Sequence, residues 1–256
     1  MTTTPSARAE QQYASSTGNL TARMALHSYG TNPQTWFSWL AGRLSPAGRV
    51  LEVGAGTGEL WRHLDHGGVD LTLVDSSPAM CDRLAGVAGA SVHRCDAGAL
   101  PFADGSFDMV IANHMLYHVD DPAAVLREFA RVSRPGGRLA VATNGGGHMR
   151  EITELGTRIG RPDIMLGRSV SDFTAESGPG LVAAAFQDVR VEEFPGDLAV
   201  PDAGPVLAYL GSMALSPLSD GELAAARAIV EERIAADGVF RVRKHTVLIT
   251  AAAGRG

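Results

Sequence analysis

Short apolar runs alternate with amphipathic stretches along the chain after residue 48. The apolar runs are rich in Val, Leu and Ile and are bounded by turns, which predicts buried strands, and the stretches between them have helical spacing. The predicted strands cover residues 49–53, 70–74, 90–94, 107–112 and 138–143, and the predicted helices cover 59–65, 78–86 and 122–133. This alternation indicates βαβ units and a parallel sheet, with ligand chemistry at the carboxyl ends of the strands.

The chain changes character after residue 144. Residues 145–216 begin with glycines, contain several prolines and favour only short helices around one strand over 188–194. Such a segment either covers a binding crevice or is a surface excursion. A long helix over 220–236, a turn at Gly238 and a last strand over 240–251 are predicted to complete the sheet.

Composition and charge restrict the class of protein. Lys and Arg total 22 against 28 Asp and Glu, a net charge of −6, which argues against a nucleic-acid partner because phosphate binding needs clustered cations. The 45% hydrophobic content is that of a globular chain, and no run approaches the ~18 apolar residues that a membrane helix needs. With two cysteines and no apolar leader, we expect a soluble cytoplasmic protein with no metal site and no membrane partner.

A glycine-rich loop directly follows the first predicted strand. Gly54, Gly56 and Gly58 stand at alternate positions, where the missing Cβ lets the backbone turn sharply and a ligand approach closely. A dinucleotide-binding loop would have the spacing G-x-G-x-x-G. Glu52, two residues before the first glycine, would repel a pyrophosphate but suits a ligand with a cationic amino group. A carboxylate that only stabilises the loop is the alternative role.

Two more carboxylates follow the next two predicted strands. Asp75 comes about 20 residues after the glycines, where a carboxylate can accept bonds from both ribose hydroxyls. Asp96 follows the third strand and can accept a bond from the exocyclic amine of a purine. The simpler alternatives are a helix N-cap for Asp75 and a turn residue for Asp96.

These segments, with Phe107–Asn113 and the Arg-Pro-Gly-Gly-Arg stretch at 134–138, resemble the class I S-adenosylmethionine-dependent methyltransferases. The similar branch is the small-molecule one that includes the ubiquinone/menaquinone-type enzymes, and the resemblance is strong over about residues 36–144. It implies a Rossmann-like, doubly wound α/β fold: a seven-stranded, mostly parallel sheet with the last strand antiparallel. It also implies an N-terminal helical lid over 1–45, a methyltransferase domain over 46–256, and an acceptor-side insertion over 145–216.

The resemblance assigns cofactor roles to individual positions. The backbone of the glycine loop would line the methionine and ribose part of S-adenosylmethionine, Glu52 would hold the methionine end, and Asp75 the ribose. Met80 has ordinary core packing as its alternative role. The implied cofactor-binding residues are Glu52, Gly54, Ala55, Gly56, Asp75, Ser76, Met80, Asp96, Ala97 and Asn113.

The candidate catalytic residues follow the fourth strand. An in-line methyl transfer needs alignment and exclusion of water, and a hydroxyl acceptor also benefits from a general base. His114 and His118 are the candidates, and the absence of a dedicated base is the third possibility. Tyr117 either shapes the acceptor pocket or is a core aromatic, and Asp121, before a proline, reads as a helix N-terminus.

Aromatic residues upstream of the sheet supply the lid candidates. Tyr13 and Tyr29 are candidate gate and substrate-binding residues, because an aromatic ring with a polar tip suits the boundary between water and a dry pocket. The stretch over 34–44 has helical spacing and is expected to pack against the domain.

The predicted function is methyl transfer from S-adenosylmethionine, with S-adenosylhomocysteine as product, to an O or N atom of a small molecule. The Arg-rich, Ala- and Gly-rich composition resembles that of actinobacterial enzymes that tailor antibiotics, so a secondary metabolite is the expected acceptor. The alternatives are C-methylation, a nicotinamide-dependent oxidoreductase on a similar fold, and a non-catalytic cofactor-binding protein. A homo-oligomer is compatible with the sequence.

Overall fold

The computed structural model describes residues 25–164 and 172–254, and the candidate Tyr13 lies outside these ranges. The described chain forms two compact units. We call residues 34–145, 172–194 and 246–254 the sheet unit, and residues 25–33, 146–164 and 195–245 the helical unit. This division differs from the predicted boundary between residues 45 and 46, because Trp39 and Leu40 are buried in a core of the sheet unit.

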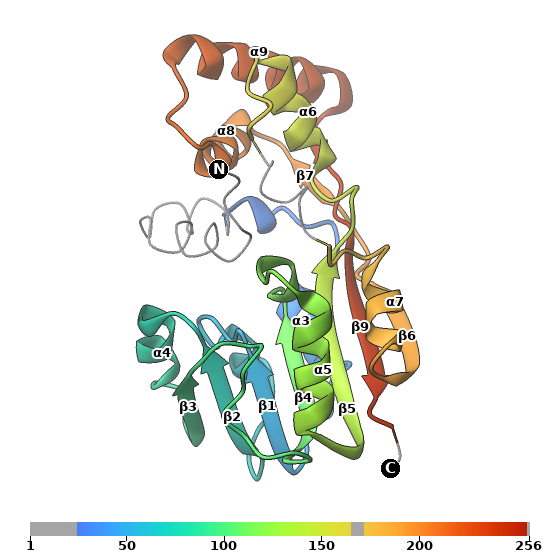
Figure 1. Cartoon of the computed structure of the whole chain (residues 1–256). Coiled ribbons are helices and arrows are strands. Elements are labelled where there is room, and N and C mark those ends of the chain that lie inside the picture. The colour runs from blue at the N-terminus through green and yellow to red at the C-terminus, as the bar shows by residue number, and fades with distance from the viewer. Residues whose placement is uncertain (1–24, 165–171, 255–256) are drawn as a thin grey trace. The chain divides into compact units, whose positions relative to one another are not determined.

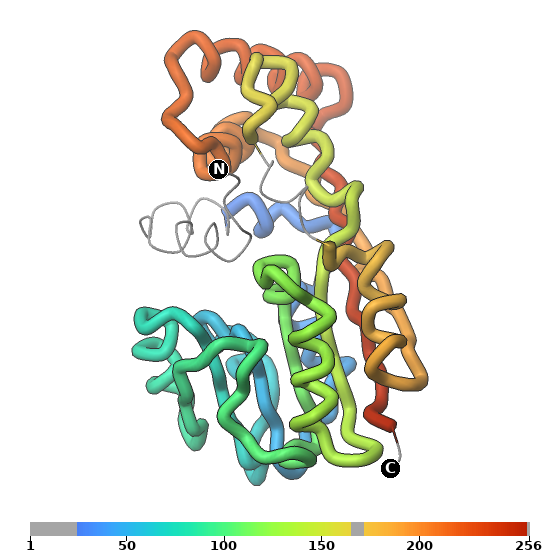
Figure 2. The backbone as a smooth tube through the Cα atoms, viewed as in Figure 1, coloured from blue at the N-terminus to red at the C-terminus, as the bar shows by residue number. Residues whose placement is uncertain are grey.

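The sheet unit is organised around seven strands in the order β3-β2-β1-β4-β5-β9-β6 (Figure 1). Strands β1 to β5 pair in parallel, and β9 is antiparallel to both of its neighbours, beside β5 along its length (Figure 2). The strands are β1 (Arg49–Val53), β2 (Asp70–Asp75), β3 (Ala90–Arg94), β4 (Phe107–Asn113), β5 (Ser133–Asn144), β6 (Gln187–Glu193) and β9 (Thr246–Ala252). The predicted α/β sheet with an antiparallel last strand is therefore confirmed.

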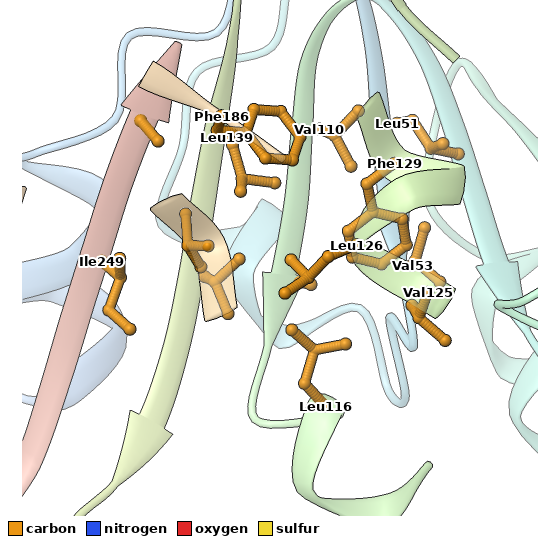
Figure 3. Packing of buried hydrophobic residues seen from close by; sticks show 14 of the residues in the cluster. Leu51, Val53, Val110, Leu116, Val125, Leu126, Phe129, Leu139, Phe186 and Ile249 are labelled. Atoms are coloured by element: carbon orange, nitrogen blue, oxygen red, sulfur yellow. The ribbon is translucent and has the colours of Figure 1, made fainter. Parts of the chain in front are cut away.

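Both faces of the sheet are covered, because side chains along each strand alternate between two cores. On one face, α5 (Pro122–Val132) and α7 (Gly178–Ala183) pack over the strands. Figure 3 shows Leu126 and Phe129 of α5 against strand residues such as Val53 and Val110. On the other face lie α3 (Trp36–Ala41), the 3₁₀ helix η1 (Glu59–Arg62) and α4 (Pro78–Leu84). The helix–sheet–helix arrangement leaves the carboxyl ends of the parallel strands together at one edge.

The helical unit has its own core, around the two-stranded antiparallel pair of β7 (Leu198–Val200) and β8 (Phe240–Val242). Its helices are α6 (Arg150–Arg158), α8 (Ala203–Met213) and α9 (Asp220–Asp237). A capping box between Ser219 and Glu222 begins α9, and Gly238, at the predicted turn, ends it in the left-handed conformation. Within the described ranges, no helix has the length and apolar content to cross a membrane.

The predicted last strand over 240–251 is wrong as one element. The structure divides it into β8 and β9, which belong to different sheets. Three consecutive backbone N–H groups between them donate to side chains of the helical unit: Arg243 to Glu151, Lys244 to Asp197 and His245 to His148. These bonds replace the strand ladder, and the local apolar pattern could not reveal them.

Two further predictions are corrected. The helix predicted over 59–65 is only the 3₁₀ turn η1, which ends at Arg62. The strand predicted over 138–143 begins at Ser133, directly after α5, so the Pro-Gly-Gly stretch belongs to β5. Gly136 has φ 73° at a shift in the β4–β5 register, and Gly136 and Gly137 both bond to the backbone of Ala253 after β9.

Candidate functional site

The glycine loop leaves β1 in a conformation that requires glycine. Gly54, Gly56 and Gly58 all have φ between 58° and 71°, in the left-handed region. The backbone N–H groups of Gly54 and Ala55 both donate to the carbonyl of Val74, at 2.8 and 3.0 Å, which ties the loop to the end of β2. The sequence therefore folds here into a rigid turn at the carboxyl ends of two neighbouring strands.

Asp75, the last residue of β2, is fixed by two bonds to backbone N–H groups. Its Oδ2 accepts from Gly56 and its Oδ1 from Ser77, each at 2.9 Å. A carboxylate offers about four acceptor sites, so capacity remains for hydroxyl groups of a ligand. The N-cap of α4 is Ser77. Ser76 is exposed and Met80 half-buried at the start of this helix.

Glu52 is buried one strand residue before the loop, with 2% of its surface exposed. Its Oε2 accepts from the Trp61 indole Nε1 at 2.5 Å. Burial raises the pKa of Glu52 to about 8, the Trp61 bond opposes this rise, and the charge of Asp75 adds to it. Glu52 is therefore protonated at neutral pH unless a cation binds beside it.

Asp96 and Ala97 lie in the turn that follows β3. The Oδ1 of Asp96 accepts from the backbone N–H of Gly98 at 2.6 Å, so this residue forms an Asx turn. Asp96 is exposed and Ala97 half-buried. Only Oδ1 of Asp96 makes the bond that forms the turn. The other carboxylate oxygen can therefore accept a bond from the exocyclic amine of a purine.

The segment after β4 begins with a residue in a rarely adopted conformation. His114 has φ 57°, and its backbone N–H donates to the carbonyl of Ala142 at 3.1 Å. A left-handed non-glycine residue costs energy and often marks a functional position. The His114 ring lies 5.2 Å from the Trp36 ring and 6.0 Å from the Tyr117 ring, between centroids. Tyr117 in turn lies 4.4 Å from the His118 ring.

Trp36, which the sequence indicated only as packing, is bonded to a predicted site residue. Its indole Nε1 donates to the side-chain oxygen of Asn113 at 3.1 Å. Trp36 also stacks on Trp39, 5.4 Å away, and meets Phe194 edge-on. Trp36 and Trp61 are the site residues that the sequence analysis missed. The one available signal was that a buried indole N–H needs an acceptor, which does not identify the partner.

The structure thus brings most predicted positions to the carboxyl edge of the sheet, after β1, β2, β3 and β4. Tyr29 lies in the helical unit, half-buried against the core of that unit. Asp121 is the N-cap of α5, as the sequence indicated, and accepts from the backbone N–H of Ala124. Cys81 and Cys95 are free thiols, and no cluster of three or more His, Cys, Asp or Glu in the described ranges is placed to hold a metal.

Comparison with known proteins identifies similar chains. Residues 51–141 match the family model described as a methyltransferase domain. A demethylmenaquinone methyltransferase of Beutenbergia cavernae is 45% identical over 104 residues, which is 38% of this chain and 41% of that protein. An uncharacterized methyltransferase of Mycobacterium tuberculosis is 40% identical over 121 residues, 45% of this chain and 49% of that protein. The chain therefore spans less than half the length of these curated relatives.

Solved structures with the same fold cover more of the chain. The YcgJ protein of Bacillus subtilis aligns with a TM-score of 0.59 at 17% identity, over 86% of this chain and 98% of that one. Phosphoethanolamine N-methyltransferase 2 of Haemonchus contortus, in complex with S-adenosylhomocysteine, aligns with a TM-score of 0.60 at 17% identity, over 99% and 61%. At this identity the likeness establishes the fold alone.

Proposed function

We propose that this chain, whose residues 51–141 match a methyltransferase domain, is a class I S-adenosylmethionine-dependent methyltransferase that transfers a methyl group to an oxygen or nitrogen atom of a small molecule. The observation that carries the proposal is the arrangement of Glu52, the glycine loop and Asp75. A buried acid, a tight backbone turn and a fixed carboxylate stand at the ends of two adjacent strands.

The residues present fit the cofactor. A Cβ added at Gly56 would meet no atom within 4 Å, so this face of the loop beside Asp75 is open. Asp75 would accept the ribose hydroxyls, and Asp96 the purine amine. Glu52 would pair with the cationic amino group, directly or through water. When bound, S-adenosylmethionine supplies a methyl group on a positively charged sulfonium, so the chain needs mainly to align the acceptor and exclude water.

His114 is our candidate general base for a hydroxyl acceptor. It directly follows β4, and the centroids of the Trp36 and Tyr117 rings lie 5.2 and 6.0 Å from that of its own ring. His118 is the second candidate, and an amine that arrives deprotonated would need no base. Tyr117 is the acceptor-side candidate in the sheet unit. Tyr13 and Tyr29 remain proposed substrate-binding residues because of their amphipathic rings.

C-methylation is the second candidate reaction. It is favoured by the 40% identity, over 98 residues, with a ubiquinone/menaquinone biosynthesis C-methyltransferase of Desulfotalea psychrophila. For the acceptor we propose a secondary metabolite, as in antibiotic tailoring, and a cytoplasmic setting without nucleic-acid or membrane partners. The net charge of −6 supports the exclusion of nucleic acid. Size-exclusion chromatography distinguishes a monomer from a homo-oligomer.

Substitution of Asp75 tests the cofactor site. We expect Asp75→Ala to raise the dissociation constant for S-adenosylhomocysteine at least about tenfold, the scale of a lost hydrogen bond to a charged group. Asp75→Asn keeps an oxygen for one of the two backbone N–H groups that Asp75 accepts, so it removes the charge and only one of these bonds. Asp70→Ala is the matched control, because Asp70 stands at the exposed amino end of the same strand, 3.6 Å from Arg49. Unchanged affinity in both Asp75 variants would overturn the proposed site.

A further inference from the structure

Two side chains of α5 hold the loop that leads from the Asp96 turn to β4. We call residues 100–105 the anchored loop. The Arg131 Nη1 donates to the carbonyl of Phe102 and to Oδ1 of Asp104, both at 2.7 Å, and its Nη2 donates to the carbonyl of Leu100 at 3.0 Å. Glu128 Oε1 accepts from the backbone N–H of Leu100 at 2.8 Å. The loop backbone is therefore bound by a cation and an anion from one helix.

Glu128 and Arg131 are also bonded to each other. The pair is bidentate, with Nε to Oε2 at 2.9 Å and Nη2 to Oε1 at 2.6 Å. Their side chains are only 16% and 32% exposed, and the bonds from Arg131 lower the pKa of Glu128. A lysine could not make this set of contacts, because it lacks the planar fork of donors. The pair therefore has a defined geometry, which an exposed ion pair would lack.

The anchored loop is continuous with the turn that carries Asp96. Asp96 accepts from Gly98 through its side chain and from Ala99 through its carbonyl, at 2.6 and 3.2 Å. This turn ends one residue before Leu100, the residue that both α5 side chains hold. A Cβ at Gly98 would lie 3.9 Å from the Val125 side chain, so the turn itself also approaches α5. Moving Leu100 away from α5 would therefore displace the Asp96 carboxylate.

We infer that Glu128 and Arg131 are positioning residues for the Asp96 turn, and that they set how strongly the site selects adenine over a purine without the exocyclic amine. This inference rests on the proposed function, in which Asp96 receives that amine. Neither residue needs to touch the cofactor. Their effect passes through Leu100 to the turn, so it should concern the purine end of the ligand and leave the ribose end unchanged.

The test compares two ligands that differ at one group, S-adenosylhomocysteine and S-inosylhomocysteine, in which a carbonyl replaces the amine. We expect the unchanged protein to bind the adenine ligand at least about tenfold more tightly, the scale of one hydrogen bond to a charged group. In Arg131→Met the ratio of the affinity for S-adenosylhomocysteine to that for S-inosylhomocysteine should fall at least about fivefold, because most of that hydrogen bond would be lost. Arg127→Met is the matched control: Arg127 is on the same helix, 67% exposed, and reaches Asp121 only at 4.0 Å. Its ratio should stay unchanged.

The ratio of two affinities separates positioning from a general structural role. A variant that is only less stable has fewer active molecules but keeps the same ratio. An unchanged ratio in Arg131→Met would overturn the inference. If Arg131→Met does not fold, Glu128→Gln is tested in its place. Glutamine keeps an oxygen that accepts from the Leu100 N–H, but it removes the charge that binds Arg131. Failure of the unchanged protein to bind S-adenosylhomocysteine would instead refute the proposed function. Equal binding of both ligands by the unchanged protein would refute the purine role of Asp96 and this inference with it.

Discussion

The buried carboxyl of Glu52 makes a sharp prediction about stability and pH. The residue is 2% exposed, and its pKa is raised from its ordinary value of 4.5 to about 8, chiefly by burial. Between these values the folded chain holds a proton that the unfolded chain has lost. Stability contributed by this site is therefore highest at low pH and falls as the pH rises from 4.5 to 8. The free energy of unfolding falls by about 1.4 kcal/mol for each pH unit, so it falls by about 5 kcal/mol over the whole interval.

The Glu52→Gln variant isolates this effect. Glutamine keeps an oxygen to accept from Trp61 but does not titrate, while all other groups remain in place. We measure the free energy of unfolding by urea denaturation from pH 5 to pH 9. As the pH rises, the value for the unchanged protein should fall by several kcal/mol relative to that of the variant. Glu193→Gln, on the exposed strand β6, is the control and should follow the unchanged protein. A difference between Glu52→Gln and the unchanged protein that is constant with pH would refute the reasoning.

The same group links cofactor binding to a proton. A cationic amino group beside Glu52 favours the carboxylate, so binding below pH 8 should release a proton. Affinity for S-adenosylhomocysteine should then rise with pH up to about 8 in the unchanged protein and much less in Glu52→Gln. Calorimetry in buffers of different ionisation enthalpy measures the proton directly.

Two other substitutions test the site. If His114 is the base for a hydroxyl acceptor, His114→Ala should lower turnover about 10²-fold or more while the affinity for S-adenosylhomocysteine stays within about twofold. Full activity of the variant would remove His114 from the mechanism. Gly54→Ala places a Cβ 2.6 Å from the Met115 Cβ, on a backbone with φ 68°. Left-handed strain alone costs about 1–2 kcal/mol, and the clash with Met115 should make the loss of stability larger than that. Gly68→Ala, with φ 81° and no atom within 4 Å, is its control in thermal unfolding, and equal losses would exclude the Met115 clash.

The sheet could be predicted because its strands are short apolar runs bounded by turns. The predicted bounds of β3 agree with the structure at both ends, and β4 extends one residue further, to Asn113. The division between β8 and β9 could not be predicted, because side chains distant in sequence, such as Asp197, accept the backbone N–H groups there. The local pattern of apolar and polar residues predicts which segments are buried and where turns lie. The bonds between β8 and β9 depend on side chains that only the folded chain brings close.

The places of the proposed site residues in the fold could be predicted in the same way. Strand ends locate Glu52, Asp75 and Asp96, because the carboxyl ends of parallel strands meet at one edge. The partners that fix them were not predictable. Trp61 reaches Glu52 across the loop, and Arg131 acts on the Asp96 turn through backbone carbonyls, which carry no sequence signal.

Calorimetric titration of the unchanged protein with S-adenosylmethionine, S-adenosylhomocysteine and NADH, in parallel, tests the central claim most directly. The arrangement of Glu52, the glycine loop and Asp75 predicts micromolar binding of the first two ligands and none of NADH. Binding of NADH alone would contradict the assignment of the loop, and with it the methyltransferase function.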